Sequence, residues 1–77
     1  MEKIYAILHQ VKEDVDFEHL SNFLETEALD SIDIMTLVEL LETEFDIQIG
    51  GRDILPENFA DVDAITALVK KYGGELS

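Results

Sequence analysis

The sequence predicts a small all-α bundle of three main helices and one short helix, with a long first loop. Three segments repeat apolar residues at the spacing of a helix that buries one face. Only residues 45–49 alternate like a strand, and no other segment offers that strand a partner. With 77 residues, the chain has room for one domain, residues 1–77, around a single core.

The first helix is predicted over residues 2–14, followed by a loop. Its apolar residues at helical spacing are Ile4, Ile7, Leu8, Val11 and Val15. Residues 15–29 keep no sustained period, and a plain connection of this length is unusual in a compact domain. Their apolar residues are Phe17, Leu20, Phe23 and Leu24. We therefore expect a long loop that its aromatic side chains hold against the core.

The second helix is predicted to begin at Ser31 and to end near Asp46. Its core stripe consists of Ile34, Leu37, Val38, Leu41 and Phe45. Residues 45–49 are expected to form an extended connector, because a lone strand would lack a ladder partner. Gly50 and Gly51 then break the chain.

A short helix is predicted at Pro56 and a longer one after Asp61, which is a good N-cap residue. The core stripe of the last helix consists of Val62, Ile65, Leu68, Val69 and Tyr72. Lys70 and Lys71 suit its C-terminal dipole, and Gly73 ends it. Residues 73–77 are expected to form a frayed tail.

The chain is strongly acidic, with 18 acidic and 5 basic residues and a formal net charge of −13. This charge argues against nucleic acid and anionic membranes as partners, and favours a basic protein surface. An alternative is that the charge only keeps a small protein soluble. Cysteine is absent, and neither a signal peptide nor a membrane-spanning segment is evident, so we expect a soluble cytoplasmic protein.

Ser31 stands where the second helix begins, directly after Asp30. Ser and Asp are both good N-cap residues, so either could simply cap the helix. On the helical wheel, however, Ile32 and Met35 lie away from the core stripe and beside Ser31. Glu39 and Glu42 share this side. An apolar contact bordered by acidic side chains is typical of a docking surface.

The end of the same helix carries Glu42, Glu44 and Asp46, although anions at a helix C-terminus are unfavourable by about 0.3–1 kcal/mol each. Residues that oppose the helix dipole in this way, without an evident gain in stability, often indicate a functional surface. Loose divalent binding at these three carboxylates would relieve their repulsion, and it predicts modest thermal stabilisation by calcium or magnesium. The sequence has no specific EF-hand loop.

Ser31 lacks an evident catalytic partner. A nucleophilic serine needs a base within hydrogen-bond reach and a group that orients the base. The histidines of the chain are His9, on the polar side of the first helix, and His19, in the loop. We therefore expect no enzymatic activity from the chain itself.

Residues 29–49, LDSIDIMTLVELLETEFDIQI, resemble the centre of the acyl and peptidyl carrier proteins. The shared features are an Asp-Ser pair opening the second helix, an aliphatic residue after the serine, and an acidic helix ending in a Phe-Asp-x-x-Ile run. The resemblance implies a four-helix bundle whose serine, here Ser31 with Asp30 as its motif neighbour, receives 4′-phosphopantetheine from coenzyme A. The thiol of this arm would carry an acyl or aminoacyl group as a thioester.

The same resemblance implies the partners of a monomeric carrier. These are a phosphopantetheinyl transferase, an acyl or aminoacyl ligase, and downstream synthase or transferase enzymes with basic surfaces. The residues expected to meet them are Ile32, Asp33, Met35, Glu39 and Glu42.

The chain departs from the carriers of fatty acid synthesis at two places. It lacks their Gly before the Asp-Ser pair, where Leu29 precedes Asp30, and Glu39 stands where those proteins often have an apolar residue. It looks more like the free-standing carriers of specialised pathways, including aminoacyl and D-alanyl carriers. Fatty acid, polyketide and peptide biosynthesis all stay open at this point.

A different class of function is also compatible with the sequence. The chain could be an acidic interaction module, such as an inhibitor of a basic enzyme or a nucleic-acid mimic, in which Ser31 is only a helix cap. Ser31→Ala would then cost capping stability and leave partner binding intact.

Overall fold

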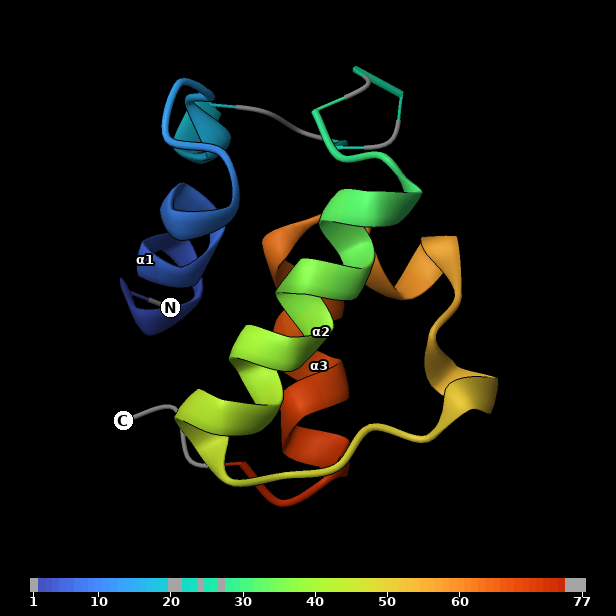
Figure 1. Cartoon of the computed structure of the whole chain (residues 1–77). Helices are drawn as coiled ribbons and strands as arrows, with labels where there is room; N and C mark the ends of the chain where they lie inside the picture. Colours follow the sequence, from blue (N-terminus) through green and yellow to red (C-terminus); the bar gives the residue numbers. More distant parts are fainter. Residues whose placement is uncertain (1, 20–21, 24, 27, 75–77) are drawn as a thin grey trace.

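The computed structural model describes residues 2–19, 22–23, 25–26 and 28–74. In chain order the elements are α1 (Glu2–Val11), η1 (Phe17–His19), α2 (Ser31–Phe45), η2 (Gly51–Asp53), η3 (Pro56–Phe59) and α3 (Val62–Lys71), where η denotes a 3-10 helix. No strand occurs in these ranges, so the predicted all-α class is confirmed. In Figure 1, α2 crosses in front of α3, and α1 lies to one side.

α1 is shorter than the helix predicted over residues 2–14. The Lys12 N–H still donates to the Leu8 carbonyl at 2.9 Å, but the chain then turns at residues 13–15. Val15 packs against the core from this turn rather than from a helix. The apolar spacing extended the predicted helix too far, because Val15 contacts the same core from a turn after the helix has ended.

The first loop is held by its aromatic residues, as predicted. Phe17 and Phe23 are fully buried, and their ring centroids lie 5.1 Å apart in an edge-to-face arrangement. The Phe23 N–H also donates to the Ala60 carbonyl at 2.7 Å, which ties the loop to the segment before α3. Leu20 and Leu24 lie outside the described residues.

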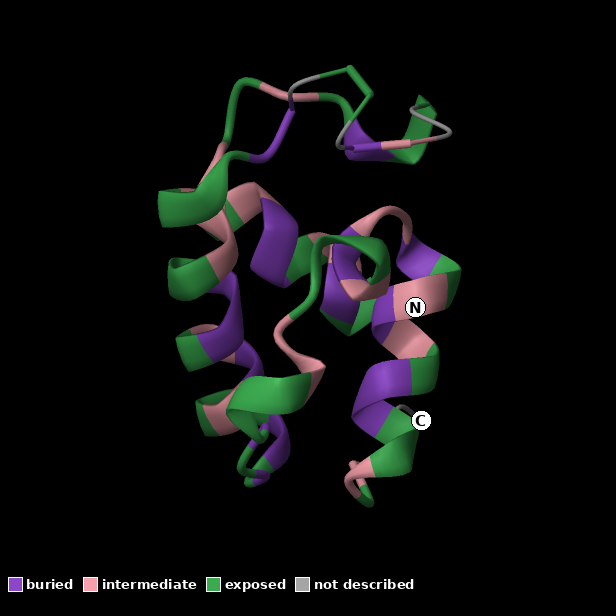
Figure 2. Cartoon of the chain, turned by 90° about the vertical axis from the view of Figure 1, so that its right-hand side faces the viewer, coloured by how far each residue is buried: buried purple, intermediate pink, exposed green. Residues whose placement is uncertain are grey.

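The core lies between the three α-helices, whose inner sides are buried and outer sides exposed (Figure 2). Four of the five stripe residues predicted for α2 are buried, and Ile34 is partly buried. η3 packs against α3 and buries Phe59 completely. Each such aromatic stabilises the fold by about 1.5–3 kcal/mol through apolar burial. No described helix is long and apolar enough to cross a bilayer.

The segment after α2 is extended, as predicted, and not a strand. Asp46 takes a left-handed backbone conformation with φ 53°, which ends α2, and Ile47 and Ile49 are then buried. The predicted glycine break is in place, but Gly51 also starts the unpredicted η2. Leu55 is extended before Pro56, and the predicted short helix is the 3-10 helix η3.

α3 begins where it was predicted. Asp61 is the N-cap, and its Oδ1 accepts a hydrogen bond from the Ala64 N–H at 2.7 Å. The helix ends at Lys71, so Tyr72 lies one residue beyond it. The N–H groups of Gly73 and Gly74 donate to the Lys70 and Val69 carbonyls, and these two residues are therefore tied to α3 rather than frayed. Residues 75–77 lie outside the described residues.

Candidate functional site

The beginning of α2 is fixed by a capping box. Asp30 has an extended backbone, and its Oδ1 accepts a hydrogen bond from the Asp33 N–H at 2.9 Å. In return, Asp33 Oδ2 accepts one from the Asp30 N–H at 3.2 Å. The bond from the Asp33 N–H is the main reason why the pKa of the Asp30 carboxyl is lowered.

Ser31 is therefore the first residue of the helix and not its cap. The sequence left open which of Asp30 and Ser31 performs the capping, and the structure assigns it to Asp30. The interpretation of Ser31 as a helix cap is wrong, because Asp30 has the extended backbone of the cap and accepts the Asp33 N–H with its carboxylate and the Ile34 N–H with its carbonyl.

The Ser31 side chain is exposed, and its hydroxyl forms no hydrogen bond within the described part of the chain. Neither histidine ring is directed to this hydroxyl. His9 Nε2 lies 2.9 Å from Glu18 Oε1, and His19 Nδ1 lies 2.6 Å from Asp16 Oδ2. The bond with His9 also lowers the pKa of the Glu18 carboxyl. Neither imidazole is therefore placed to act as a base for the Ser31 hydroxyl, which is exposed to an outside reagent.

Two large apolar side chains next to Ser31 face solvent, as the helical wheel predicted. Ile32 is 75% exposed and Met35 is 55% exposed. A third large apolar residue, Leu55, is 41% exposed just before η3 and was not singled out from the sequence. Leu55 directly precedes Pro56, which keeps it extended and outside any helix or sheet. This position in the sequence could have identified it as an exposed residue.

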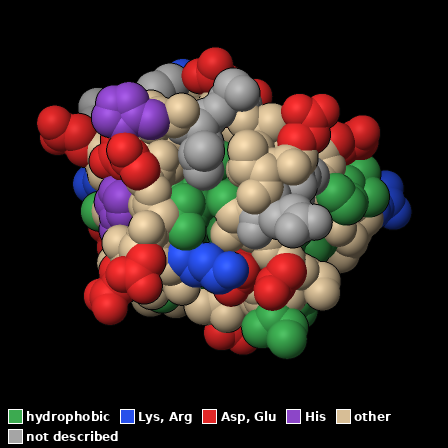
Figure 3. Space-filling view, turned by 90° about the horizontal axis from the view of Figure 1, so that it is seen from above, with side chains coloured by type: hydrophobic (Ala, Val, Ile, Leu, Met, Phe, Trp, Pro, Cys, Tyr) green, Lys and Arg blue, Asp and Glu red, His purple; other side chains and the backbone are tan. Residues whose placement is uncertain are grey.

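The acidic residues predicted around Ser31 differ in their exposure and in the hydrogen bonds and ion pairs that they form. Glu39 is exposed, whereas the Glu42 carboxylate accepts a hydrogen bond from the Ile49 N–H at 2.9 Å. The Asp33 carboxylate is both hydrogen-bonded and ion-paired: it accepts a bond in the capping box and lies 3.1 Å from Lys12 Nζ. Its side chain is only 15% exposed. The pairing of Lys12 with Asp33 was not predicted from the sequence. Acidic side chains outnumber basic ones on the end of the molecule where α2 begins (Figure 3).

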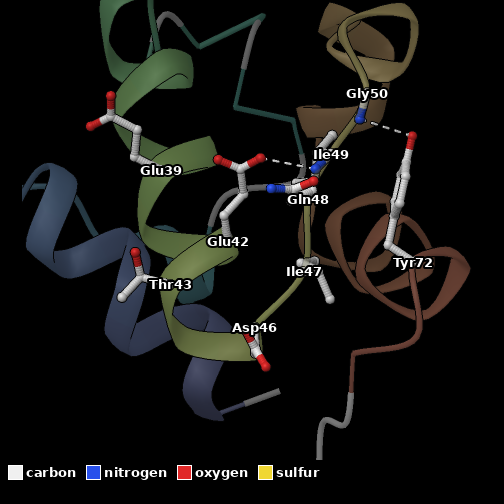
Figure 4. Close-up of a pocket in the computed structure, with 9 residues that line it drawn as sticks. All are labelled: Glu39, Glu42, Thr43, Asp46, Ile47, Gln48, Ile49, Gly50 and Tyr72. Atoms are coloured by element: carbon white, nitrogen blue, oxygen red, sulfur yellow. Dashed lines mark hydrogen bonds between the residues drawn. The ribbon is translucent and has the colours of Figure 1, made fainter.

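An open groove of about 820 Å³ runs along the second half of α2. Its lining residues are Glu39, Glu42, Thr43, Asp46, Ile47, Gln48, Ile49, Gly50 and Tyr72. Figure 4 shows Glu42 turned toward the connector and Tyr72 reaching Gly50 from the other side. The loose divalent binding predicted at Glu42, Glu44 and Asp46 stays a prediction, because these carboxylates are not gathered into one site. No group of three or more His, Cys, Asp or Glu in the described ranges could hold a metal ion.

A comparison with protein-family models matches residues 3–69 to the family described as phosphopantetheine attachment site. The match covers most of the chain. This chain belongs to the phosphopantetheine attachment site family. The resemblance to acyl and peptidyl carrier proteins is thereby confirmed, and the domain is the attachment site of a covalent 4′-phosphopantetheine. The comparisons with curated proteins and with solved structures gave no match.

The residues of this phosphopantetheine attachment domain fit such a group. The exposed Ser31 hydroxyl, which has no hydrogen-bond partner among the described residues, lies at the start of α2, where the helix dipole favours a negative phosphate. The bound arm supplies a thiol, which this chain lacks because it contains no cysteine. The domain is therefore a phosphopantetheine-carrying carrier protein.

Proposed function

We propose that Ser31 is the residue that receives the arm. The observation that carries this proposal is its free, exposed hydroxyl at the first position of α2, next to a cap that leaves this hydroxyl unused. In the loading reaction the Ser31 oxygen forms a bond to the phosphate that bears pantetheine, and the bond from that phosphate to 3′,5′-ADP breaks. Because neither His9 nor His19 is directed to Ser31 in the described part of the chain, we expect the transferase to supply the base that takes the proton, and the metal that neutralises the pyrophosphate.

The loaded chain would act as a carrier with no catalytic activity of its own. Its thiol would hold an acyl or aminoacyl group as a thioester and present it to partner enzymes. Residues Ile32 and Met35 would give these partners an apolar contact of moderate size. The acidic residues Asp33, Glu39 and Glu42 would guide basic surfaces toward that contact, and Glu39 is best placed for this because it is exposed and unpaired within the described chain.

The proposed partners are a phosphopantetheinyl transferase, an acyl or aminoacyl ligase, and a downstream synthase or transferase. A monomer acting in the cytoplasm suits repeated weak contacts, because a carrier has to leave each enzyme for the next. The Leu29-Asp30-Ser31 motif and the acidic Glu39 support a specialised biosynthetic pathway rather than general fatty acid synthesis.

Intact mass spectrometry after incubation with coenzyme A, magnesium and a broad-specificity transferase tests the proposal. Wild type should gain the mass of one phosphopantetheine, and Ser31→Ala should gain none. Because Ser31 does not cap α2, Ser31→Ala should keep its melting temperature, and its failure to load would then report on the hydroxyl.

Ala67→Ser is a matched control, since it places a new hydroxyl on the exposed side of α3. This variant should gain one arm and not two. Loading of a folded Ser31→Ala variant, or no loading of wild type by several transferases, would contradict the proposal and favour an acidic interaction module.

A further inference from the structure

Lys12 forms an ion pair that joins the end of α1 to the beginning of α2. Its Nζ lies 3.1 Å from Asp33 Oδ2, the same oxygen that accepts the Asp30 N–H. The lysine side chain is 37% exposed and that of Asp33 is 15% exposed, so the pair is partly withdrawn from solvent. Lys12 thus places a positive charge directly beside the capping box, whose two aspartates, Asp30 and Asp33, flank Ser31 in the sequence.

The other basic residues are occupied elsewhere or exposed. Lys3 lies over the ring of Phe45, at the far end of α2, and Lys71 pairs with Asp53. Arg52 and Lys70 are exposed and form no ion pair within the described residues. Of the 5 basic residues, Lys12 alone is ion-paired with α2 in the described chain.

Modification changes the charge balance at this position. The first turn of α2 and its cap already hold two carboxylates, Asp30 and Asp33. A phosphodiester on Ser31 adds a third negative charge within about one helical turn, and like charges this close in the chain repel each other. The helix dipole offsets only part of this repulsion. Lys12 already acts on this cluster, since its charge adds to the effect of the Asp33 N–H in lowering the pKa of Asp30.

We propose that Lys12 is a positioning residue and counter-ion for the modified form of the protein. It holds Asp33 in the capping box, and it offsets the charge that the phosphodiester adds at Ser31. This role rests on the proposed function, and it assigns Lys12 a larger contribution after loading than before.

A comparison of four species tests this role: wild type and Lys12→Met, each without and with the arm. Thermal unfolding followed by circular dichroism gives the melting temperature of each species. Lys12→Met should lower it by about 2–4 °C in the unloaded form, as expected for a partly exposed pair. In the loaded form the loss should be about twice as large. At 1 M salt the extra loss should shrink, because the Debye length falls to about 3 Å.

Three further variants separate charge from packing. Lys12→Arg should restore most of the stability in both forms, and Lys12→Gln should behave like Lys12→Met, which also covers the case in which the Met variant does not fold. Lys70→Met removes an exposed, unpaired lysine from α3 and should change both forms equally.

Equal losses for Lys12→Met in the loaded and unloaded forms would overturn the proposed role, because an ion pair that serves only the fold cannot sense the arm. Intact mass of the same samples shows whether Ser31 was loaded. Absence of the arm on wild type would instead overturn the proposed function, and this role with it.

Discussion

The helices α2 and α3 begin alike and end differently. Each has an aspartate N-cap, Asp30 or Asp61, that accepts a hydrogen bond from the third residue of the helix. At their ends, α3 carries Lys70 and Lys71, whereas α2 has no basic residue in its last turn. On their outer sides, α2 exposes Ile32 and Met35, while no large apolar residue of α3 is exposed. The inner sides of both helices thus stabilise the fold by apolar burial. The outer side of α2 instead exposes apolar residues, where partners are expected to bind.

The largest expected effect lies on the shared inner side. Leu41 in α2 and Ile65 in α3 are both fully buried. Leu41→Ala and Ile65→Ala should each lower the free energy of unfolding by about 2–5 kcal/mol, through lost apolar burial and the cavity left behind. Urea unfolding measures both. A large loss at one position and almost none at the other would show that the two helices do not share one core.

The next largest effect is expected on loading by the transferase, and it distinguishes the outer side of α2 from that of α3. Ile32→Ser should lower kcat/KM for loading by the transferase about tenfold or more, because an exposed isoleucine buried on docking contributes about 1.5–3 kcal/mol. Its melting temperature should stay close to that of wild type. Steady-state loading assays with Ala67→Ser as the matched change on α3 provide the comparison. Equal kcat/KM for the two variants would remove Ile32 from the partner surface.

A smaller effect distinguishes the helix ends. Asp46 ends α2 at φ 53°, a conformation that costs a non-glycine residue about 1–2 kcal/mol, and its charge opposes the helix dipole. Asp46→Gly should therefore raise the free energy of unfolding by about 1 kcal/mol. Gly73 follows α3 at φ 86°, and Gly73→Asp should lower the free energy of unfolding by a similar amount. Chemical denaturation of both variants checks this, and destabilisation by Asp46→Gly would contradict it.

The smallest effect concerns acid stability near the end of α3. The Tyr72 hydroxyl donates to Asp53, and this bond, followed by Lys71, lowers the pKa of the Asp53 carboxyl. Asp53 therefore stabilises the fold above its unfolded-state pKa, and this contribution is lost as the pH falls through the lower folded-state pKa. Urea unfolding from pH 7 to about pH 3 should show a smaller acid loss in Tyr72→Phe than in wild type. Tyr5→Phe is the control, and it should retain the wild-type slope.

The helices and the exposed apolar pair could be predicted from the sequence because both follow from helical spacing. The stripes of α2 and α3 identify the buried side, and the same wheel leaves Ile32 and Met35 outside. The Asp61 cap was also predictable, since a capping residue acts on groups only three positions away.

The features that the sequence did not reveal depend on contacts between distant residues. The pairing of Lys12 with Asp33 needs the end of α1 to lie beside the beginning of α2, and spacing along the chain contains no such information. The choice between Asp30 and Ser31 as the cap depends on one backbone conformation. The end of α1 was misplaced for a related reason, because Val15 reaches the core without being helical.

The central claim is that the free hydroxyl at the first position of α2 receives the arm. The chain contains three serines, Ser21, Ser31 and Ser77, so fragmentation of the loaded protein by tandem mass spectrometry can assign the modified residue directly. The account predicts phosphopantetheine on Ser31 and on neither of the other two. An arm on Ser21 or Ser77, with Ser31 unmodified, would contradict it.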